Sequence, residues 1–296
     1  MSHSTNARHI KVGVGQIEAA TFDLHANLGK HIEMIREARD RGVEMLLFPE
    51  LSLTGYMIGP AAIDLAMPRH DPFLLQLAAH AKGMTVVAGF VEEAPAAQFY
   101  NSSVAMRDGA VLFVHRKLNL ATYGNLEEDK YFAEGRYIDV FSHRSPWTAG
   151  ILICADVWNP GLVHLAALHG CTMLLAPVAS SVEAVFGDFS NPRGWELALS
   201  FYAMMYGMPV LMANHWGRFD DLNFFGQSRI VDPHGNTLAV ADDKECLITA
   251  ELDYHIVRRA RFQLPTVRDS NLDLIHREIE RMANRIGVPW SVLEKR

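Results

Sequence analysis

The sequence predicts one large α/β domain, and three observations support that prediction. Short apolar segments of strand type alternate along the chain with longer segments whose apolar residues recur at helical spacing. The chain has 296 residues, 49% of them hydrophobic, which suffices for one large core or for two domains. No linker rich in Pro, Ser or Gly, no repeat and no low-complexity run divides the chain, so one domain is favoured.

The first half of the chain is predicted to contain five strands and two helices. Apolar residues alternate over 10–17, as in a strand, and recur at helical spacing over 27–41, up to Gly42. Asp71-Pro72 opens a second helix, to about residue 82, because Pro suits the first turn of a helix. Further strands are expected over residues 43–48, 84–91, 100–106 and 110–115, the last two joined as a hairpin.

The second half of the chain continues the alternation. Strands are expected over residues 137–141, 147–153, 172–176, 210–214 and 246–252, with a hairpin over 226–241. A helix is expected after the turn at Pro160, up to Gly170. Two more helices are expected: 195–206 is apolar nearly all round, and 271–287 is amphipathic. The loop over 118–135 is long, and we expect it to line a pocket because long ordered loops are often functional.

Cys154 stands where one of these strands stops and a helix is about to start. It follows the apolar run 150–153, and Asn159-Pro160 gives a turn that also suits a helix start. A side chain at such a bend points out of the sheet edge with backbone N–H groups nearby, as in a nucleophile elbow. The alternative is one more buried structural cysteine, since free Cys is among the most buried residue types.

Two other predicted strands also end in a chemically active residue. Glu50 follows an apolar run that is broken by Pro49, and Lys117 follows the apolar run 111–114. A carboxylate at the end of a buried strand is partly desolvated, which raises its pKa and suits it to carry protons. Each charge alone fits a solvated strand end equally well, but Glu, Lys and Cys at three strand ends form a constellation.

These stretches together resemble the motifs of the carbon–nitrogen hydrolase (nitrilase) superfamily. Residues 48–51, 115–120 and 154–160 are similar to its three motifs, and 225–228 with 232–235 to its final hairpin. The resemblance covers about residues 10–265. It implies a four-layer α-β-β-α sandwich, a catalytic Glu50, Lys117 and Cys154, and a homodimer or a higher homo-oligomer.

The resemblance also implies a reaction. Cys154 attacks an amide carbonyl while Glu50 takes its proton, and Lys117 with the backbone N–H of Ala155 stabilises the oxyanion. Ammonia or an amine leaves, and water hydrolyses the thioester. A second glutamate of the family matches Glu128, with Glu127 as the alternative if the register shifts by one residue.

The substrate is expected to be a small linear amide or an N-carbamoyl compound. Nitrilases proper tend to carry Trp-Glu after the cysteine, whereas this chain has Ala155-Asp156. The surroundings are apolar and aromatic, which favours a neutral or aromatic acyl group unless Arg193 faces the pocket. His215 either shapes the acyl site or packs structurally. The candidate substrate-binding residues are Tyr56, Tyr123, Ala155, Asp156, His215 and Trp216.

Three other functions stay open from the sequence. The first is a nitrilase that acts on a nitrile, and the second is a non-catalytic or redox-sensing protein that uses the reactive cysteine. An intact set of Glu50, Lys117 and Cys154 argues against the second. The third, a glutaminase domain that feeds ammonia to a synthetase, is disfavoured because no second catalytic domain follows.

Composition limits the partners and the compartment. The net charge of −7 and the lack of a basic run disfavour nucleic acid and anionic membranes. The polar residues 1–9 are expected to be a flexible N-terminus, and 266–296 a tail whose amphipathic helix lies at a subunit interface. Three cysteines without metal-type spacing indicate a reduced, cytoplasmic protein, and no cofactor or metal is expected.

Overall fold

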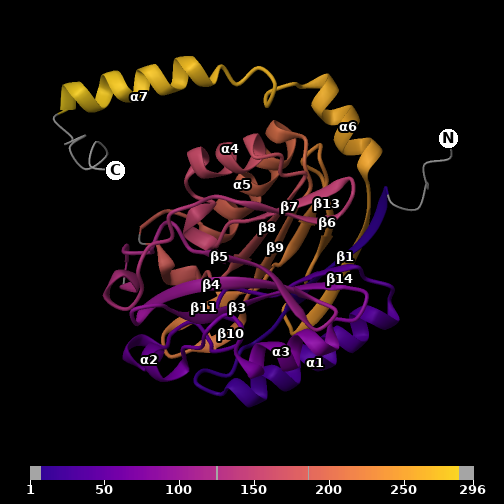
Figure 1. Ribbon diagram of the computed structural model, residues 1–296, viewed down its shortest axis with the longest axis vertical. Coiled ribbons are helices and arrows are strands. Elements are labelled where there is room, and N and C mark those ends of the chain that lie inside the picture. Colours follow the sequence, from indigo (N-terminus) through magenta and orange to yellow (C-terminus); the bar gives the residue numbers. More distant parts are fainter. Residues whose placement is uncertain (1–7, 125, 186, 287–296) are drawn as a thin grey trace.

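Two six-stranded sheets form the centre of the molecule, and helices cover their outer faces. The computed structural model describes residues 8–124, 126–185 and 187–286. Helices α1 (Leu24–Asp40) and α3 (Pro72–His80) cover the first sheet. Helices α4 (Pro160–Leu168) and α5 (Asn191–Tyr206) cover the second (Figure 1). These four layers are the α-β-β-α sandwich that the sequence predicts.

The first sheet joins the two ends of the domain. Its strand order is β14-β1-β2-β3-β4-β5, and β14 pairs antiparallel with β1. The C-terminal strand therefore closes the sheet that the N-terminal strand begins. The six strands are β1 (His9–Gln16), β2 (Met45–Leu47), β3 (Thr85–Ala94), β4 (Gln98–Arg107), β5 (Ala110–Arg116) and β14 (Cys246–Asp253).

The second sheet has the order β13-β12-β9-β8-β7-β6. Its strands are β6 (Val140–Arg144), β7 (Trp147–Ile151), β8 (Met173–Val178), β9 (Val210–Asn214), β12 (Arg229–Val231) and β13 (Thr237–Val240). Strands β7, β8 and β9 run parallel, so their carboxyl ends meet at one edge of the sheet. The separate hairpin β10 (Trp216–Phe219) and β11 (Leu222–Phe225) follows at that edge.

The period of two along each strand divides the apolar side chains between two cores. In β2, Met45 and Leu47 join the core shared with the second sheet, whereas Leu46 joins the core under α1 and α3. In β3, Val87 and Phe90 divide in the same way. Both faces of the central strands are therefore buried, which explains their nearly continuous hydrophobic runs.

Most predicted elements are present, and the differences have local causes. Helix α1 begins three residues before the predicted start, because the Asp23 side chain caps it by accepting from the N–H of Ala26 at 2.9 Å. The hairpin β10–β11 and helix α6 (Tyr254–Gln263) are not predicted by the sequence. The hairpin strands have four residues each, too few to show a period, and α6 is polar and rich in Arg.

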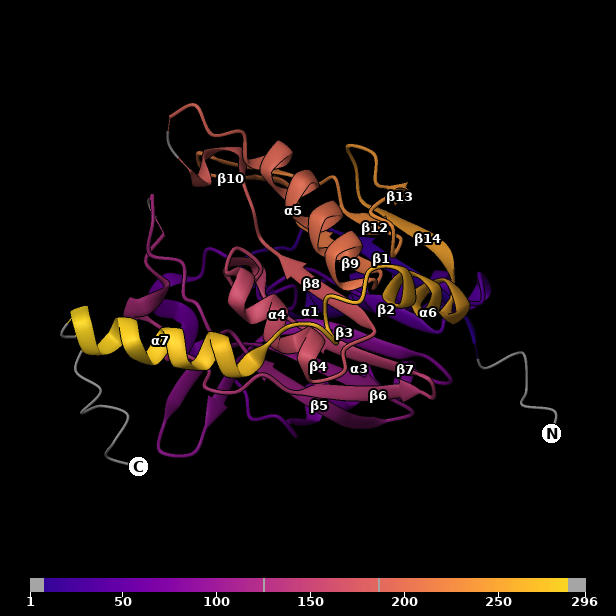
Figure 2. The ribbon, with the colours of Figure 1, turned by 90° about the horizontal axis from the view of Figure 1, so that it is seen from above.

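The sandwich covers only one side of helix α5, and the tail helix stands apart from the sandwich. The outer side of α5 exposes about half of Leu197, Phe201 and Met204. Helix α7 (Leu272–Ile286) runs beyond α4 at the outside of the molecule (Figures 1 and 2). The outer parts of the predicted N-terminus and tail, 1–7 and 287–296, lie outside the described residues. No described helix is both long and apolar enough to cross a membrane.

Candidate active site

The bend that carries Cys154 has the geometry that the sequence predicts. Strand β7 ends at Ile151, and Cys154 opens a single 3₁₀ turn, Cys154–Asp156. The backbone of Cys154 has a φ of 44°, in the left-handed region, which costs about 1–3 kcal/mol for a residue other than glycine. The surrounding contacts must therefore hold this conformation.

Asp156 supplies part of that support. Its Oδ2 accepts from the N–H of Ile153 at 2.9 Å, while Oδ1 accepts from the N–H groups of Leu118 and Asn119 at 2.9 and 2.7 Å. The side chain is fully buried. The sequence predicts Asp156 among the substrate-binding residues, and the structure shows which groups its carboxylate already meets. Its carboxylate is occupied by backbone groups and ties the Cys154 bend to the segment after Lys117.

Lys117 lies between two carboxylates at the centre of the site. Its Nζ donates to Oε1 of Glu50 at 2.6 Å and to Oε1 of Glu128 at 2.7 Å. Lys117 and Glu50 are fully buried, and Glu128 is 6% exposed. Buried charges at such distances stabilise one another only when they are paired and hydrogen-bonded, as here. The structure thus brings three of the predicted catalytic residues into direct contact.

The structure decides between the two candidate second glutamates. Glu128 accepts from Lys117, from the hydroxyl of Tyr56 at 2.7 Å and from the N–H of Ala121 at 2.8 Å. Glu127 instead is 53% exposed in its side chain and pairs with Lys130. Glu128 is therefore the glutamate of the site.

Asn101 is a residue of the site that the sequence does not single out. Its side-chain Nδ2 donates to Oε1 of Glu50 at 2.8 Å, and its backbone carbonyl accepts from the backbone N–H of Lys117 at 2.8 Å. The register of the β4–β5 hairpin could have identified Asn101 from the sequence. It pairs Ser102 with Arg116 and so places Asn101 beside Lys117. With Oε1 of Glu50 held by two donors, Oε2 is buried and has no hydrogen-bond partner among the residues that the structure describes.

Burial dominates the protonation of the site. It raises the pKa of Glu50 to about 7, against the lowering effect of Lys117. Burial lowers the pKa of Lys117, but Glu128 and Glu50 outweigh it and keep the ammonium charged. Burial and Glu50 raise the pKa of the Cys154 thiol, while Lys117 and a backbone hydrogen bond at Ala179 oppose the rise. The resting cysteine is therefore a thiol beside a base that titrates near neutrality.

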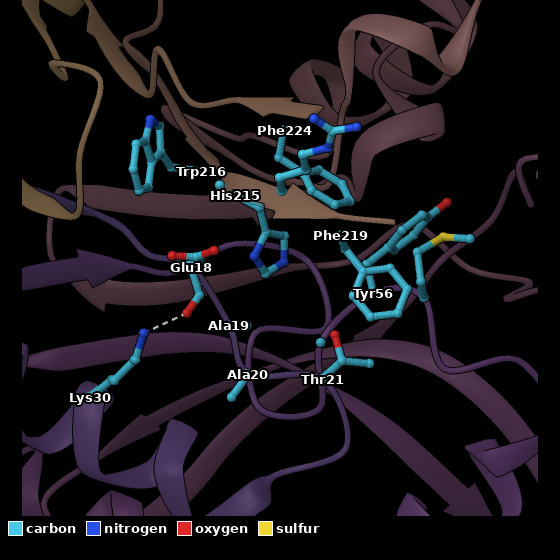
Figure 3. Close-up of a pocket in the computed structure, with 14 residues that line it drawn as sticks. Glu18, Ala19, Ala20, Thr21, Lys30, Tyr56, His215, Trp216, Phe219 and Phe224 are labelled. Carbon is cyan, nitrogen blue, oxygen red and sulfur yellow. Dashed lines mark hydrogen bonds between the residues drawn. The ribbon is translucent and has the colours of Figure 1, made fainter. Parts of the chain in front are cut away.

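Two cavities flank the site and share Tyr56, Met57 and Phe219. The first has a volume of about 400 Å³ and extends between the segment after β1 and the β10–β11 hairpin. Figure 3 shows it, with Lys30 hydrogen-bonded to the backbone oxygen of Glu18 at one end. The second, of about 490 Å³, is lined by Glu127, Glu128 and mostly aromatic or aliphatic residues.

The remaining predicted substrate-binding residues divide into three places. Trp216 and His215 line the first cavity, and Nε2 of His215 also lies 2.6 Å from the carbonyl oxygen of Glu50. Tyr123 is 39% exposed in the loop after β5, and its partial burial raises its pKa. Ala155 is buried next to Cys154.

Arg193 does not line either of the two cavities. It projects from α5, is 60% exposed in its side chain, and pairs with Glu196 at 2.5 Å. Arg193 therefore adds no positive charge to the lining of these two cavities. Within the described ranges, no group of three or more His, Cys, Asp or Glu side chains is arranged to hold a metal ion.

Comparison with known proteins agrees with the motifs. Residues 11–262 match the carbon–nitrogen hydrolase family. The chain is 32% identical to a glutamine-dependent NAD(+) synthetase of Thermotoga maritima, over 83% of this chain and 42% of that protein. It thus spans about two fifths of that relative. It is 26% identical to an N-carbamoylputrescine amidase of Arabidopsis thaliana, over 91% of this chain and 96% of that protein.

A solved structure shows the same fold over nearly the whole chain. It is a mutant of the amidase from Nesterenkonia sp. AN1, with the acetamide moiety of fluoroacetamide added covalently at its active-site cysteine. The TM-score is 0.77 at 25% identity, and the match covers 92% of this chain and 97% of that one. The fold of two sheets flanked by helices is therefore confirmed as that of the nitrilase superfamily. The chain belongs to the carbon–nitrogen hydrolase family.

Proposed function

We propose that the protein hydrolyses the C–N bond of a small linear amide or N-carbamoyl compound through a thioester at Cys154. The observation that carries this proposal is the buried Lys117 ammonium, held by both Glu50 and Glu128 beside a thiol at a strained bend. A carboxylate that titrates near pH 7 next to a thiol is suited to general-base catalysis at neutral pH.

In the acylation step, the unpartnered Oε2 of Glu50 accepts the thiol proton as Sγ of Cys154 bonds to the carbonyl carbon. The carbonyl oxygen becomes an oxyanion, which Lys117 and the N–H of Ala155 stabilise. The tetrahedral intermediate collapses, the C–N bond breaks, and Glu50 returns the proton to the departing nitrogen. Free ammonia or an amine and a thioester result.

In the deacylation step, Glu50 takes a proton from water as the water oxygen bonds to the thioester carbon. The C–S bond then breaks, and the proton returns to the Cys154 sulfur. Glu128 keeps Lys117 in place throughout. A carboxylate offers about four lone-pair positions, and three of those on Glu128 are occupied by Lys117, Tyr56 and Ala121. The fourth is available to an N–H of the substrate amide.

The relatives support an amide or carbamoyl substrate. An N-carbamoylputrescine amidase matches nearly the whole chain, and a citrullinase of Francisella tularensis is 27% identical over 90% of it. The name of the NAD(+) synthetase relative includes glutamine, which is itself a linear amide. Another mutant of the Nesterenkonia sp. AN1 amidase was solved in complex with butyramide. Butyramide, glutamine and N-carbamoylputrescine are therefore the first compounds to test.

We expect amides to be better substrates than nitriles. A nitrile has no N–H for Glu128 to accept, so that carboxylate would contribute little to its binding. The measurement is kcat/KM for ammonia release from matched pairs, an amide and its parent nitrile with the same acyl chain. A preference for the nitrile in several pairs would contradict the proposal and favour a nitrilase.

We also propose that the protein self-associates. Leu197, Phe201 and Met204 expose about half their surface on α5. The tail helix α7 exposes a second apolar row, Leu272, Ile275, Ile279 and Met282. Apolar patches of this kind on a folded chain favour association, because burial removes them from water.

Light scattering at micromolar concentration is expected to give at least twice the chain mass of 33.1 kDa. Phe201→Glu should shift the protein toward the single chain, and removal of residues 271–296 should weaken association. Leu112→Glu is the matched control, since Leu112 is 48% exposed on β5 of the other sheet. A wild-type mass of one chain would contradict the proposal.

A further inference from the structure

The bend that carries Glu50 is strained and tightly packed. Leu51, the next residue, has a φ of 48° and is fully buried. Strand β3 lies so close that a Cβ on Gly89 would come within 2.1 Å of the backbone nitrogen of Leu51. Gly89 also donates its N–H to Oγ of Ser52 at 3.1 Å and accepts from the N–H of Leu53 at 3.0 Å. Strand β3 thus fixes the residues after Glu50.

His215 reaches the same bend from the other half of the fold. It follows β9 of the second sheet, and its Nε2 lies 2.6 Å from the carbonyl oxygen of Glu50, 165 residues away in sequence. Its side chain is 3% exposed and its ring lies 5.6 Å from that of Phe224. Figure 3 shows the ring pointing from the end of that strand into the space between Glu18 and Tyr56.

We infer that His215 is a positioning residue for Glu50. Its imidazole N–H donates to the Glu50 carbonyl and so fixes the peptide plane that follows the carboxylate-bearing residue. This orients Oε2 of Glu50 toward Cys154, while Lys117 and Asn101 hold Oε1. The inference rests on the proposed function, in which Glu50 is the base.

The protonation state of His215 suits this role. Burial lowers its pKa to about 4, and the hydrogen bonds to the backbones of Glu50 and Ile17 only partly oppose the shift. The ring is therefore neutral at the pH where Glu50 ionises, and the short contact to a carbonyl places its one proton on Nε2. A neutral donor holds the backbone without adding a positive charge that would depress the pKa of the base.

The closest alternative is that His215 only fills space beside Phe224. Matched substitutions separate the two roles. Gln and Met have similar length and volume, but only Gln carries an N–H that can donate to the carbonyl. If His215→Met does not fold, His215→Asn replaces it, since the Asn amide is one methylene shorter and falls short of the carbonyl.

The test measures ammonia release from the best of butyramide, glutamine and N-carbamoylputrescine across pH. His215→Met is expected to lower kcat by about tenfold or more, with KM changed by less than about threefold. A displaced Glu50 loses contact with Lys117, which raises the pKa of Glu50. The acid limb of the kcat/KM profile should therefore shift to higher pH by about half a unit. His215→Gln should stay within about threefold of wild type, with the acid limb unmoved.

A control at another buried histidine makes the result specific. His143 is a buried imidazole on β6 that bonds to Oγ1 of Thr85 at 2.9 Å, so His143→Met removes a similar contact away from the bend. It should leave the acid limb unmoved. The inference is overturned if His215→Met keeps the wild-type kcat and acid limb. It is also overturned if His215→Gln loses as much kcat as His215→Met, or if His143→Met shifts the acid limb as far as His215→Met does.

Glu50→Gln distinguishes this inference from the proposed function. It should lose activity because it cannot accept the thiol proton. If Glu50→Gln stays active, the base assignment fails and the inference fails with it. If Glu50→Gln is inactive while His215→Met behaves as wild type, the inference about His215 alone is overturned.

Discussion

Cys154→Ala is expected to lower kcat by at least about 10⁴-fold, since removing a covalent nucleophile costs roughly 10⁶-fold in well-studied acyl-transfer enzymes. The side chain is nearly buried but small, and the bend is held by Asp156 through the N–H of Ile153. The fold should therefore survive. The measurements are ammonia release from a panel amide and the thermal unfolding midpoint.

Cys171→Ala is the matched control for that substitution. Cys171 is a fully buried thiol that hydrogen-bonds to the carbonyl of Met173, so its loss removes a similar volume from the interior. Activity should stay within a few-fold of wild type. Retained hydrolysis by well-folded Cys154→Ala protein would end the assignment of Cys154 as nucleophile.

Lys117→Met is expected to lower kcat by about 10²–10³-fold, because the oxyanion loses a donor worth roughly 3–4 kcal/mol. The pH profile should change as well. Burial raises the pKa of Glu50 and Lys117 lowers it, so removing the cation raises this pKa above about 7. Glu50 acts as base only when ionised, so activity is present above its pKa and is lost as pH falls through it. The acid limb should therefore move to higher pH.

The same substitution leaves Glu50 and Glu128 buried without their shared cation. We expect the free energy of unfolding to fall by about 3–5 kcal/mol, so rates must be measured where circular dichroism shows folded protein. Lys130→Met is the control, because Lys130 pairs with Glu127 at the surface and should cost less than about 1 kcal/mol. More than a tenth of the wild-type kcat in folded Lys117→Met protein would rule out the proposed role.

The grouping of the three proposed catalytic residues was predictable because each one follows a buried strand. Glu50, Lys117 and Cys154 come directly after apolar runs, and such strand ends gather at one edge of a sandwich. The sheet edge then brings together residues far apart in the chain. The order of the motifs, more than any one of them, identified the family from sequence.

The supporting contacts were not predictable because they depend on tertiary register. Asp156 looks like a pocket residue beside the nucleophile, but its carboxylate meets backbone N–H groups 37 and 38 residues away. His215 meets a carbonyl from the other half of the fold. No local pattern reports a side chain bonded to a distant backbone.

The two sides of α5 are covered to different extents. A helix that is apolar nearly all round is typical of burial in a core or in an interface. The sandwich covers Trp195 and Leu199 but leaves Phe201 half exposed. One chain shows only which side of the helix its own sheet covers.

The central claim, a thioester at Cys154, is tested most directly by mass spectrometry of the rapidly quenched wild-type enzyme during turnover of butyramide, glutamine or N-carbamoylputrescine. The account predicts one added acyl group on the peptide that contains Cys154, which hydroxylamine releases and which is absent from Cys154→Ala. Steady turnover of an amide with no acyl group on that peptide, or with the group on Cys171 or Cys246, would contradict it.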